Sequence, residues 1–314
     1  MKIEIKFEMV RHFAEGSVWI VHLAVTQRTR CRYSRPVQFA RIEYRVFPAG
    51  SAEQNVIRLN VAIEPDSERS DFTDAWGNLY RKAEWPESLD GWTLSVDLFV
   101  QTLMDNPFAF AAAAADAPVP DRDFPWPPET AGYRRWEYDP WDNEPAVEAW
   151  AREISAPVRG AFKKIQALVD AIHRQFKFCK GMTDVKTPPA EILRLKVGVC
   201  QDFSTLLIAA ARTFGLPARY VSGYIYEGPK SNRAGSAPSG HGWAEVYFPD
   251  IGWRGFDPLN GILACQTHVR VAQGRWYADA APIVGRFIGA GVTQTTETEI
   301  TVDKADASGR SIEP

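Results

Sequence analysis

The sequence contains few cysteine residues and no pattern that would join them. There are four in 314 residues, Cys31, Cys179, Cys200 and Cys265, and no two of them form a Cys-X-X-Cys pair. Disulfide frameworks use closely spaced cysteines, and structural zinc sites are built from paired ligands. We therefore expect neither a disulfide framework nor a metal site, and no cofactor.

The sequence also lacks an excess of basic charge and any long hydrophobic run. Its 36 Lys and Arg face 39 Asp and Glu, so the formal net charge is −3. We expect no nucleic-acid partner and no anionic membrane surface as a partner, because both require a basic face. No uncharged run approaches the length of a transmembrane helix, and residues 1–7 lack the apolar segment of a signal peptide. These features predict a cytoplasmic protein, and they leave its oligomeric state unknown.

The first part of the chain has the alternation of β-strands. Apolar and polar residues alternate over 41–47, 56–63 and 94–100, and proline, Gly-Asn and Asp-Gly separate these runs. Short strands at this spacing predict an antiparallel β-sandwich. His12 and His22 are isolated there, and we interpret them as surface or strand residues without a role in chemistry.

A change in composition after residue 107 predicts a domain boundary. Residues 108–117 are rich in alanine and predict a short helix, whereas the prolines that follow exclude regular structure. Trp126 and Trp136 in this stretch favour a strap packed on the surface over a wall of a substrate groove. We divide the chain into a β-rich domain (1–107), a connecting strap (108–142), a catalytic domain (143–303) and a polar tail (304–314).

Helical periodicity begins near residue 144. Apolar residues predict helices over 146–154 and 158–177, and Thr187 before two prolines predicts the N-cap of a short helix ending near 195. His173 is interpreted as a residue at the edge of its helix. A further helix is predicted from Cys200 to about 214, ended by Gly215.

An antiparallel meander is predicted after this helix, which makes the class α+β. Strands are predicted at 218–226, 241–248, 253–256, 268–271 and 296–302, and an ordered loop at 274–282. The polar segment 228–240, rich in Gly, Pro and Ser, predicts a mobile loop that could gate a cleft.

A thiol, an imidazole and a carboxylate occur in order in this region. Cys200 is predicted in the first turn of a helix, where free N–H groups and the helix dipole favour a thiolate and could bind an oxyanion. His241 begins one strand and Asp257 ends the next, and the tight turn at 249–252 brings these two ends together. Asp257 could then orient His241 toward Cys200, as nucleophilic catalysis requires.

Each of these residues also has an ordinary structural interpretation. A single cysteine is most often a small core residue, and Asp202 is better explained by the helix dipole than as a rival to Asp257. The joint pattern favours catalysis. We assign Cys200, His241 and Asp257 to the catalytic site and place four residues at the substrate cleft: Gly198, Gln201, Trp243 and Trp253.

Four ordered segments resemble the transglutaminase-like core of bacterial proteins: 198–203, 215–224, 241–246 and 252–258. Residues 1–105 resemble the β-rich region that accompanies this core, and 274–277 with 282–285 resemble its C-terminal motif. The resemblance implies a papain-like fold, with Cys200 as nucleophile, His241 as base and acid, and Asp257 as orienting residue. The chain departs from the family at Gly242, where alanine is usual, at Trp276, where aspartate is common, and at Ser204-Thr205, where Ala-His is frequent.

The expected reaction is attack of Cys200 on a peptide or Gln/Glu-type amide to form a thioester. Water would resolve it in a peptidase or amidase, which we favour because water is always available, whereas an amine would resolve it in a protein-glutamine acyltransferase. A non-catalytic protein that holds a peptide in the same cleft is the other alternative. The expected partner is in each case a peptide or protein.

Overall fold

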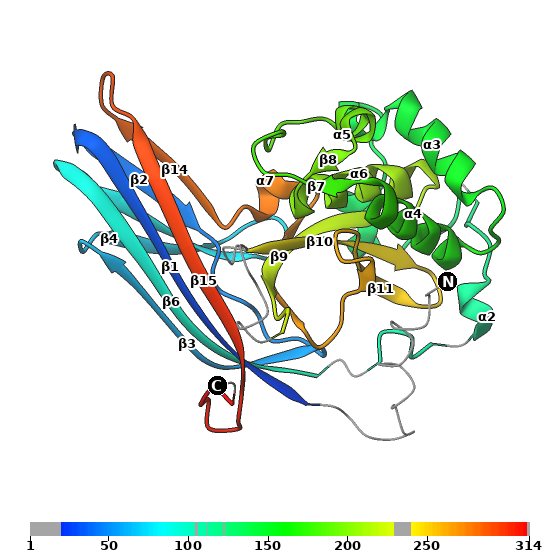
Figure 1. The fold of residues 1–314 in the computed structure, drawn as a ribbon, viewed down its shortest axis with the longest axis horizontal. Coiled ribbons are helices and arrows are strands. Elements are labelled where there is room, and N and C mark those ends of the chain that lie inside the picture. The colour runs from blue at the N-terminus through cyan, green and yellow to red at the C-terminus, as the bar shows by residue number, and fades with distance from the viewer. Residues whose placement is uncertain (1–19, 104–105, 111, 122, 229–239, 313–314) are drawn as a thin grey trace.

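The computed structural model describes residues 20–103, 106–110, 112–121, 123–228 and 240–312. An all-β unit and a unit of helices packed on a sheet lie side by side in Figure 1. The combination of helices with antiparallel sheets agrees with the predicted α+β class. His12 and most of the predicted gating loop fall outside the described residues.

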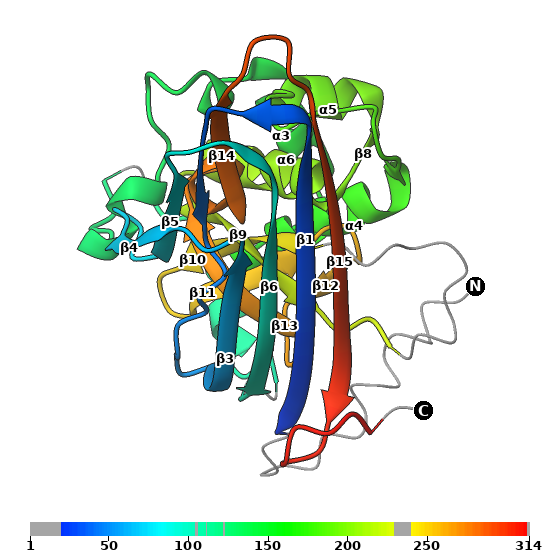
Figure 2. The same ribbon diagram turned by 90° about the vertical axis from the view of Figure 1, so that its left-hand side faces the viewer.

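Two four-stranded antiparallel sheets form the all-β unit (Figures 1 and 2). The first sheet has the order β15 (Gln294–Ala305), β1 (Val21–Val37), β6 (Leu89–Thr102) and β3 (Gln54–Glu64). The second has the order β14 (Ile283–Ile288), β2 (Phe39–Tyr44), β5 (Leu79–Trp85) and β4 (Glu68–Thr73). The predicted strands at 41–47, 56–63 and 94–100 correspond to β2, β3 and β6.

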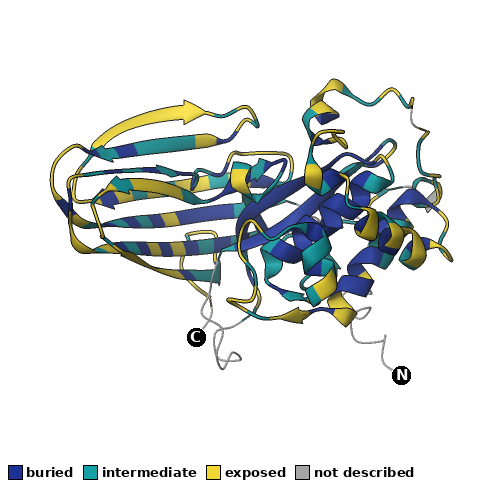
Figure 3. Cartoon of the chain, turned by 90° about the horizontal axis from the view of Figure 1, so that it is seen from above, coloured by how far each residue is buried: buried dark blue, intermediate teal, exposed yellow. Residues whose placement is uncertain are grey.

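The two sheets pack face to face, because alternate side chains of each strand point inward. Buried and partly exposed residues alternate strictly along β2, and the banding is visible on the strands in Figure 3. One cluster joins buried side chains of both sheets, among them Leu23, Val25, Ile42, Ala83 and Leu94. His22 lies on β1 with its ring stacked on Phe99 at 5.5 Å, as a strand residue.

The last two strands belong to this sandwich. β15 pairs with β1 from His22↔Ala305 to Tyr33↔Gln294, and β14 pairs with β2. The predicted domain division placed these two segments in the catalytic domain, whereas their pairing with β1 and β2 places them in the sandwich. The physical reason is that β15 covers an edge of the long strand β1, which would otherwise expose unpaired backbone groups, and local alternation does not reveal a strand's partner.

The second unit is built on a five-stranded antiparallel sheet. Its order is β12 (Ile262–Leu263), β11 (Gly252–Asp257), β10 (His241–Phe248), β9 (Ala218–Ile225) and β13 (His268–Gly274). The accompanying helices are α3 (Pro145–Ser155), α4 (Ala161–Gln175), α5 (Pro189–Leu195) and α6 (Cys200–Thr213).

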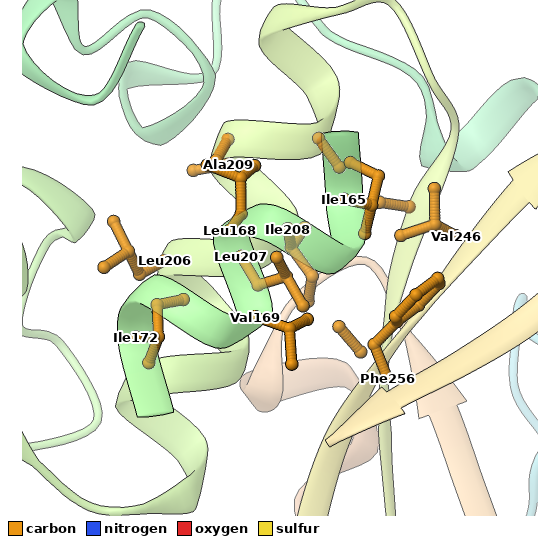
Figure 4. Close-up of a cluster of buried hydrophobic side chains, with 14 of the residues drawn as sticks. Ile165, Leu168, Val169, Ile172, Leu206, Leu207, Ile208, Ala209, Val246 and Phe256 are labelled. Atoms are coloured by element: carbon orange, nitrogen blue, oxygen red, sulfur yellow. The ribbon is translucent and has the colours of Figure 1, made fainter. Parts of the chain in front are cut away.

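The core of this unit surrounds α6. This helix is buried on almost every side from Asp202 to Arg212, as expected for a helix enclosed by other elements. Figure 4 shows Ile165, Leu168 and Ile172 of α4 facing the side chains of α6, with Val246 and Phe256 of the sheet beside them. The first residue of α6 therefore begins a helix that is enclosed by the core of the unit.

The predicted helices agree with the structure to within a few residues, with three differences. Thr187 is not an N-cap: the cap is Pro188, and the Thr187 hydroxyl accepts a hydrogen bond from the Asp184 N–H. The helix predicted at 108–117 is the single turn α2 (Ala112–Ala115), and the loop predicted at 274–282 contains the turn α7 (Tyr277–Ala280). Within the described residues, no helix combines the length and the apolar character needed to cross a membrane.

Two buried arginines bind the strap to the core. Arg212 of α6 is fully buried and donates to the carbonyl oxygen of Tyr133 (3.0 Å) and to Asp142 Oδ1 (2.9 Å). Arg275 donates to the other oxygen of Asp142 and to Asp139 Oδ2 (2.9 Å). The aromatic Trp126 packs edge-on against Tyr247 at 6.2 Å, a structural contact as predicted.

The two units meet along the free edge of β13, where side-chain amides take the place of a neighbouring strand. Gln54 accepts from the Arg270 N–H (3.0 Å) and donates to its carbonyl oxygen (2.8 Å). Asn78 makes the same pair of bonds with the backbone of Gln273, at 2.8 and 2.6 Å. The sandwich therefore satisfies the backbone of an edge strand that would otherwise need water or another chain.

Candidate active site

Cys200 is the first residue of α6 and a free, partly exposed thiol. The extended residue Val199 precedes it as N-cap. The short parallel pair β7 (Lys177–Phe178) and β8 (Val197–Gly198) fixes the approach to the helix, where the Cys179 N–H donates to the Gly198 carbonyl at 2.8 Å. The predicted position of the thiol, where unpaired helical N–H groups gather, agrees with this geometry.

Asp202 caps this helix through hydrogen bonds. Its buried Oδ2 accepts from the Val199 N–H and from the Thr183 hydroxyl, both at 2.7 Å. A Cβ on Gly198 would lie 2.7 Å from the same oxygen. Gly198, which the sequence analysis assigned to the substrate cleft, therefore makes room for the capping carboxylate. Asp202 serves the helix start, as predicted, and does not replace Asp257.

His241 and Asp257 form a buried pair at the strand ends. Residues Ala244 and Phe256 are opposite each other in the β10–β11 register, so the start of β10 lies beside the end of β11. His241 Nε2 is 2.7 Å from Asp257 Oδ2, and the two side chains are 5% and 0% exposed. The turn therefore brings the imidazole and the carboxylate together as the sequence predicted.

The electrostatics of this pair favour a charged imidazole. Burial favours the neutral ring, but hydrogen bonds to Asp257 and Cys200 outweigh it and raise the pKa of His241 to about 10. Burial likewise opposes ionisation of Asp257, yet hydrogen bonds from His241 and His268 hold the pKa of its carboxyl well below the usual range. Asp257 and Cys200 together can thus hold a proton on His241.

Asn260 and His268 complete the surroundings of Asp257 and were missed from the sequence. Asn260 donates to Asp257 through its backbone N–H (3.1 Å) and its side-chain amide (2.7 Å). His268 Nε2 lies 3.3 Å from Asp257 Oδ2. The sequence placed His268 at a strand start, but nothing local indicates that β13 brings this ring to β11. His173 Nδ1 donates to the Leu259 carbonyl at 2.8 Å, and the exposed ring makes it an edge residue as predicted.

His241, Asp257 and His268 also form a group of three potential metal ligands, with ligand atoms within 4.8 Å of one another. The sequence did not reveal this group, because its three residues lie on the different strands β10, β11 and β13. Two ligands of a tetrahedral zinc ion lie about 3.3 Å apart, given metal–ligand bonds of about 2.0–2.1 Å. The 2.7 Å separation of His241 and Asp257 is instead that of a hydrogen bond, and we assign no metal here.

The residues predicted at the substrate cleft lie in different surroundings. Trp243 is 2% exposed, and its ring lies beside His241 (6.2 Å) and edge-on to His268 (5.1 Å), so it supports the imidazoles from within the core. Trp253 stacks under Arg219 at 4.0 Å and precedes Asp257 by four residues, roughly 13 Å along the strand. Gln201 follows Cys200 in α6 and is partly exposed.

Two tyrosines lie close to Cys200 and were not singled out from the sequence. The charge of Cys200 is among the causes, after burial, that raise the pKa of both Tyr220 and Tyr277. Their rings meet edge to face at 5.7 Å. A Cβ on Gly242 would lie 1.9 Å from the Tyr220 hydroxyl oxygen, so Tyr220 occupies the space of the alanine that is usual in the family.

Gly242→Ala is therefore expected to destabilise the protein by about 1–3 kcal/mol, the usual cost of an overpacked core. Urea unfolding would measure the loss. The double variant Gly242→Ala/Tyr220→Phe should recover part of it, because the hydroxyl is removed although a ring carbon remains 2.7 Å away.

Gly240→Ala is the matched control, since its Cβ would meet nothing closer than 3.7 Å. If the changes in unfolding free energy of Gly242→Ala and Tyr220→Phe simply add in the double variant, the Tyr220 hydroxyl is not what excludes alanine at position 242.

Comparison with known proteins places these features in two families. Residues 148–258 match the family described as the transglutaminase-like superfamily, and residues 23–101 match the bacterial transglutaminase-like N-terminal region. An uncharacterized protein of Mycobacterium bovis is 30% identical over 269 residues, covering 83% of this chain and 86% of that protein. An uncharacterized protein of Mycobacterium tuberculosis (strain H37Rv) is similar to the same extent.

A solved structure has a similar fold. It is a protein of Cytophaga hutchinsonii provisionally named a cysteine protease, with a TM-score of 0.68 and 20% sequence identity. The similarity covers 92% of this chain and 94% of that one, so both units are included. At this identity the likeness concerns the fold alone.

Proposed function

Because the chain belongs to the transglutaminase-like superfamily, we propose that it is a cysteine-dependent enzyme that acts on amide bonds. The observation that carries the proposal is the buried His241–Asp257 hydrogen bond of 2.7 Å. Cys200 begins α6 and is among the groups that raise the pKa of His241. Such a constellation supplies a nucleophile, a proton carrier and an orienting carboxylate. A helix N-terminus set against strand ends is also what the predicted papain-like core requires.

The first half of the proposed reaction forms a thioester. The Cys200 thiolate attacks the amide carbonyl carbon, and the backbone N–H of Cys200 is a candidate donor to the resulting oxyanion. His241 then gives its proton to the amide nitrogen as the carbon–nitrogen bond breaks, and the amine leaves. Asp257 stays ionised and holds the Nε2 proton of His241, so that Nδ1 is the atom that faces the thiol.

The second half releases the acyl group. Neutral His241 takes a proton from water as its oxygen attacks the thioester carbonyl, and collapse of the intermediate regenerates the Cys200 thiolate and a carboxylic acid. We propose hydrolysis of peptide or Gln/Glu-type amides, because water is always available. An amine in place of water would produce a new amide, and the product distinguishes this acyltransferase reaction from hydrolysis.

The proposal is tested by the reactivity of Cys200 toward iodoacetamide near pH 7. We expect Cys200 to react at least about tenfold faster than an ordinary thiol, because only the thiolate is nucleophilic. His241→Ala should remove the advantage. Peptide mass spectrometry would quantify labelling at each site, and Cys179, a partly exposed thiol on the neighbouring chain segment, is the internal control.

Equal labelling of Cys200 and Cys179, unchanged by His241→Ala, would refute the catalytic proposal and favour a protein that only binds peptides. If Cys200 is activated, incubation with glutamine-containing peptides with and without a primary amine separates the two reactions. A mass increase equal to that of the amine less the ammonia that leaves identifies transfer, whereas a free acid identifies hydrolysis.

A further inference from the structure

Asp257 accepts hydrogen bonds from two histidine rings on the same oxygen. His241 Nε2 lies 2.7 Å and His268 Nε2 lies 3.3 Å from Asp257 Oδ2, and the three side chains are at most 5% exposed. The rings come from β10 and from β13, which are separated in the sheet by β9. A buried imidazole needs hydrogen-bond partners. His268 has its acceptor on the same carboxylate that binds His241.

The second nitrogen of His268 reveals which atom carries its proton. The backbone N–H of Cys265 lies 3.3 Å from His268 Nδ1, and the Thr267 hydroxyl lies 3.2 Å from the same nitrogen. A backbone N–H can only donate, so Nδ1 is an acceptor and the neutral ring carries its proton on Nε2. That proton points at Asp257, and the contact between them is therefore a donated hydrogen bond.

We propose that His268 is a positioning residue that acts through Asp257 on His241. Its Nε2–H holds the carboxylate in place together with the Asn260 amide, which lies 2.7 Å from the same oxygen, and it takes up part of the negative charge. Asp257 thereby orients His241 without binding its proton too tightly for release. The inference rests on the proposed function, because it gives His268 a task only where His241 transfers a proton.

Among the residues that the structure describes, few other ionisable groups surround the two rings. His241 faces Asp257 from β11, Cys200 from α6 and the ring of His268 at 5.9 Å. His268 faces Asp257 and Cys265.

Beyond these groups, a cavity of about 30 Å³, room for roughly one water, is lined by His268 together with Glu53, Glu245 and Arg270. Arg270 pairs with Glu53 (2.8 Å) and with Glu245 (3.5 Å). Arg219 also pairs with Glu245 (2.6 Å), so two arginines compensate the two carboxylates. The donor to Asp257 therefore remains the main influence of His268 on His241.

A pair of variants tests this coupling. His268→Met removes the donor and keeps an apolar side chain of similar length, whereas His268→Gln keeps an N–H near the position of Nε2. NMR titration of carbon-13-labelled histidine would measure the pKa of His241 in each protein. We expect His268→Met to raise this pKa by on the order of one unit, because Asp257 then offers more of its charge to the imidazolium, and His268→Gln to restore most of the wild-type value.

An unchanged His241 titration in His268→Met, or equal shifts in both variants, would overturn the inference and leave His268 as a packing residue. Should the variants not fold, nitrogen-15 spectra of wild-type His268 still decide, because a proton on Nδ1 instead of Nε2 contradicts the donated bond. The iodoacetamide experiment distinguishes failure of the proposed function from failure of this inference. An activated Cys200 with an uncoupled His268 refutes only this inference.

Discussion

Cys200→Ala is expected to abolish amide cleavage, lowering kcat/KM by at least about 10⁴-fold, as removal of a nucleophile does in other triad enzymes. Only a thiol can form the thioester. Tyr220 and Tyr277, which the charge of Cys200 reaches, are not activated to replace it as nucleophile, because burial raises the pKa of both. Cleavage of glutamine-containing peptides, followed by mass spectrometry, would measure the loss.

Cys179→Ala is the matched control for this variant. Its thiol lies on the segment whose backbone N–H binds Gly198, so it shares the neighbourhood of the helix start but not the imidazole. We expect Cys179→Ala to keep activity within about threefold of wild type. Activity that survives in Cys200→Ala, with the fold intact by circular dichroism, would show that another residue performs the reaction.

Asp142→Ala is expected to cost about 3–5 kcal/mol of unfolding free energy, because it leaves the buried Arg212 without its counter-charge, whereas Arg275 keeps its pair with Asp139. Asp142 is 1% exposed and accepts from Arg212, Arg275 and the Trp136 N–H. Both arginines lie in the second unit, so chemical denaturation followed by tryptophan fluorescence would report the loss. Limited proteolysis should also cut the strap around 123–142 earlier, since Asp142 fastens it to α6.

Asp170→Ala provides the comparison on the surface of α4. Its pair with Arg174 is 3.6 Å long, with side chains 58% and 68% exposed, and such exposed pairs contribute about 0–1 kcal/mol. If Asp142→Ala loses no more unfolding free energy than Asp170→Ala, the buried arginines around position 142 must relax or admit water.

Local patterns were sufficient to predict the segments that carry the candidate site. The apolar spacing before Gly215 predicts the helix, and that glycine takes the left-handed conformation (φ 77°) that ends it. The tight turn before Gly252 predicts that His241 and Asp257 meet. These features depend on residues within one helix or one hairpin, and neighbours in the chain determine them.

No local sequence pattern predicted the contacts between segments that are distant in the chain. The pairing of β1 with β15 joins His22 to Ala305, and each strand has the same alternation whatever its partner. Trp243 was predicted to line a cleft because it is aromatic, but the sheet places it in the core beside two imidazoles. The same aromatic side chain suits both places, and only the packing around it decides between them.

The sequence by itself thus determined the helix start that exposes Cys200 and the hairpin that joins His241 to Asp257. Only the tertiary structure decided what stabilises them: the His268 ring on Asp257, the Asp202 cap that requires Gly198, and the sandwich that covers the edge of β13. The physical reason is that caps, turns and periodicity are properties of adjacent residues, whereas burial and hydrogen bonding of a side chain depend on segments that meet only after the chain has folded.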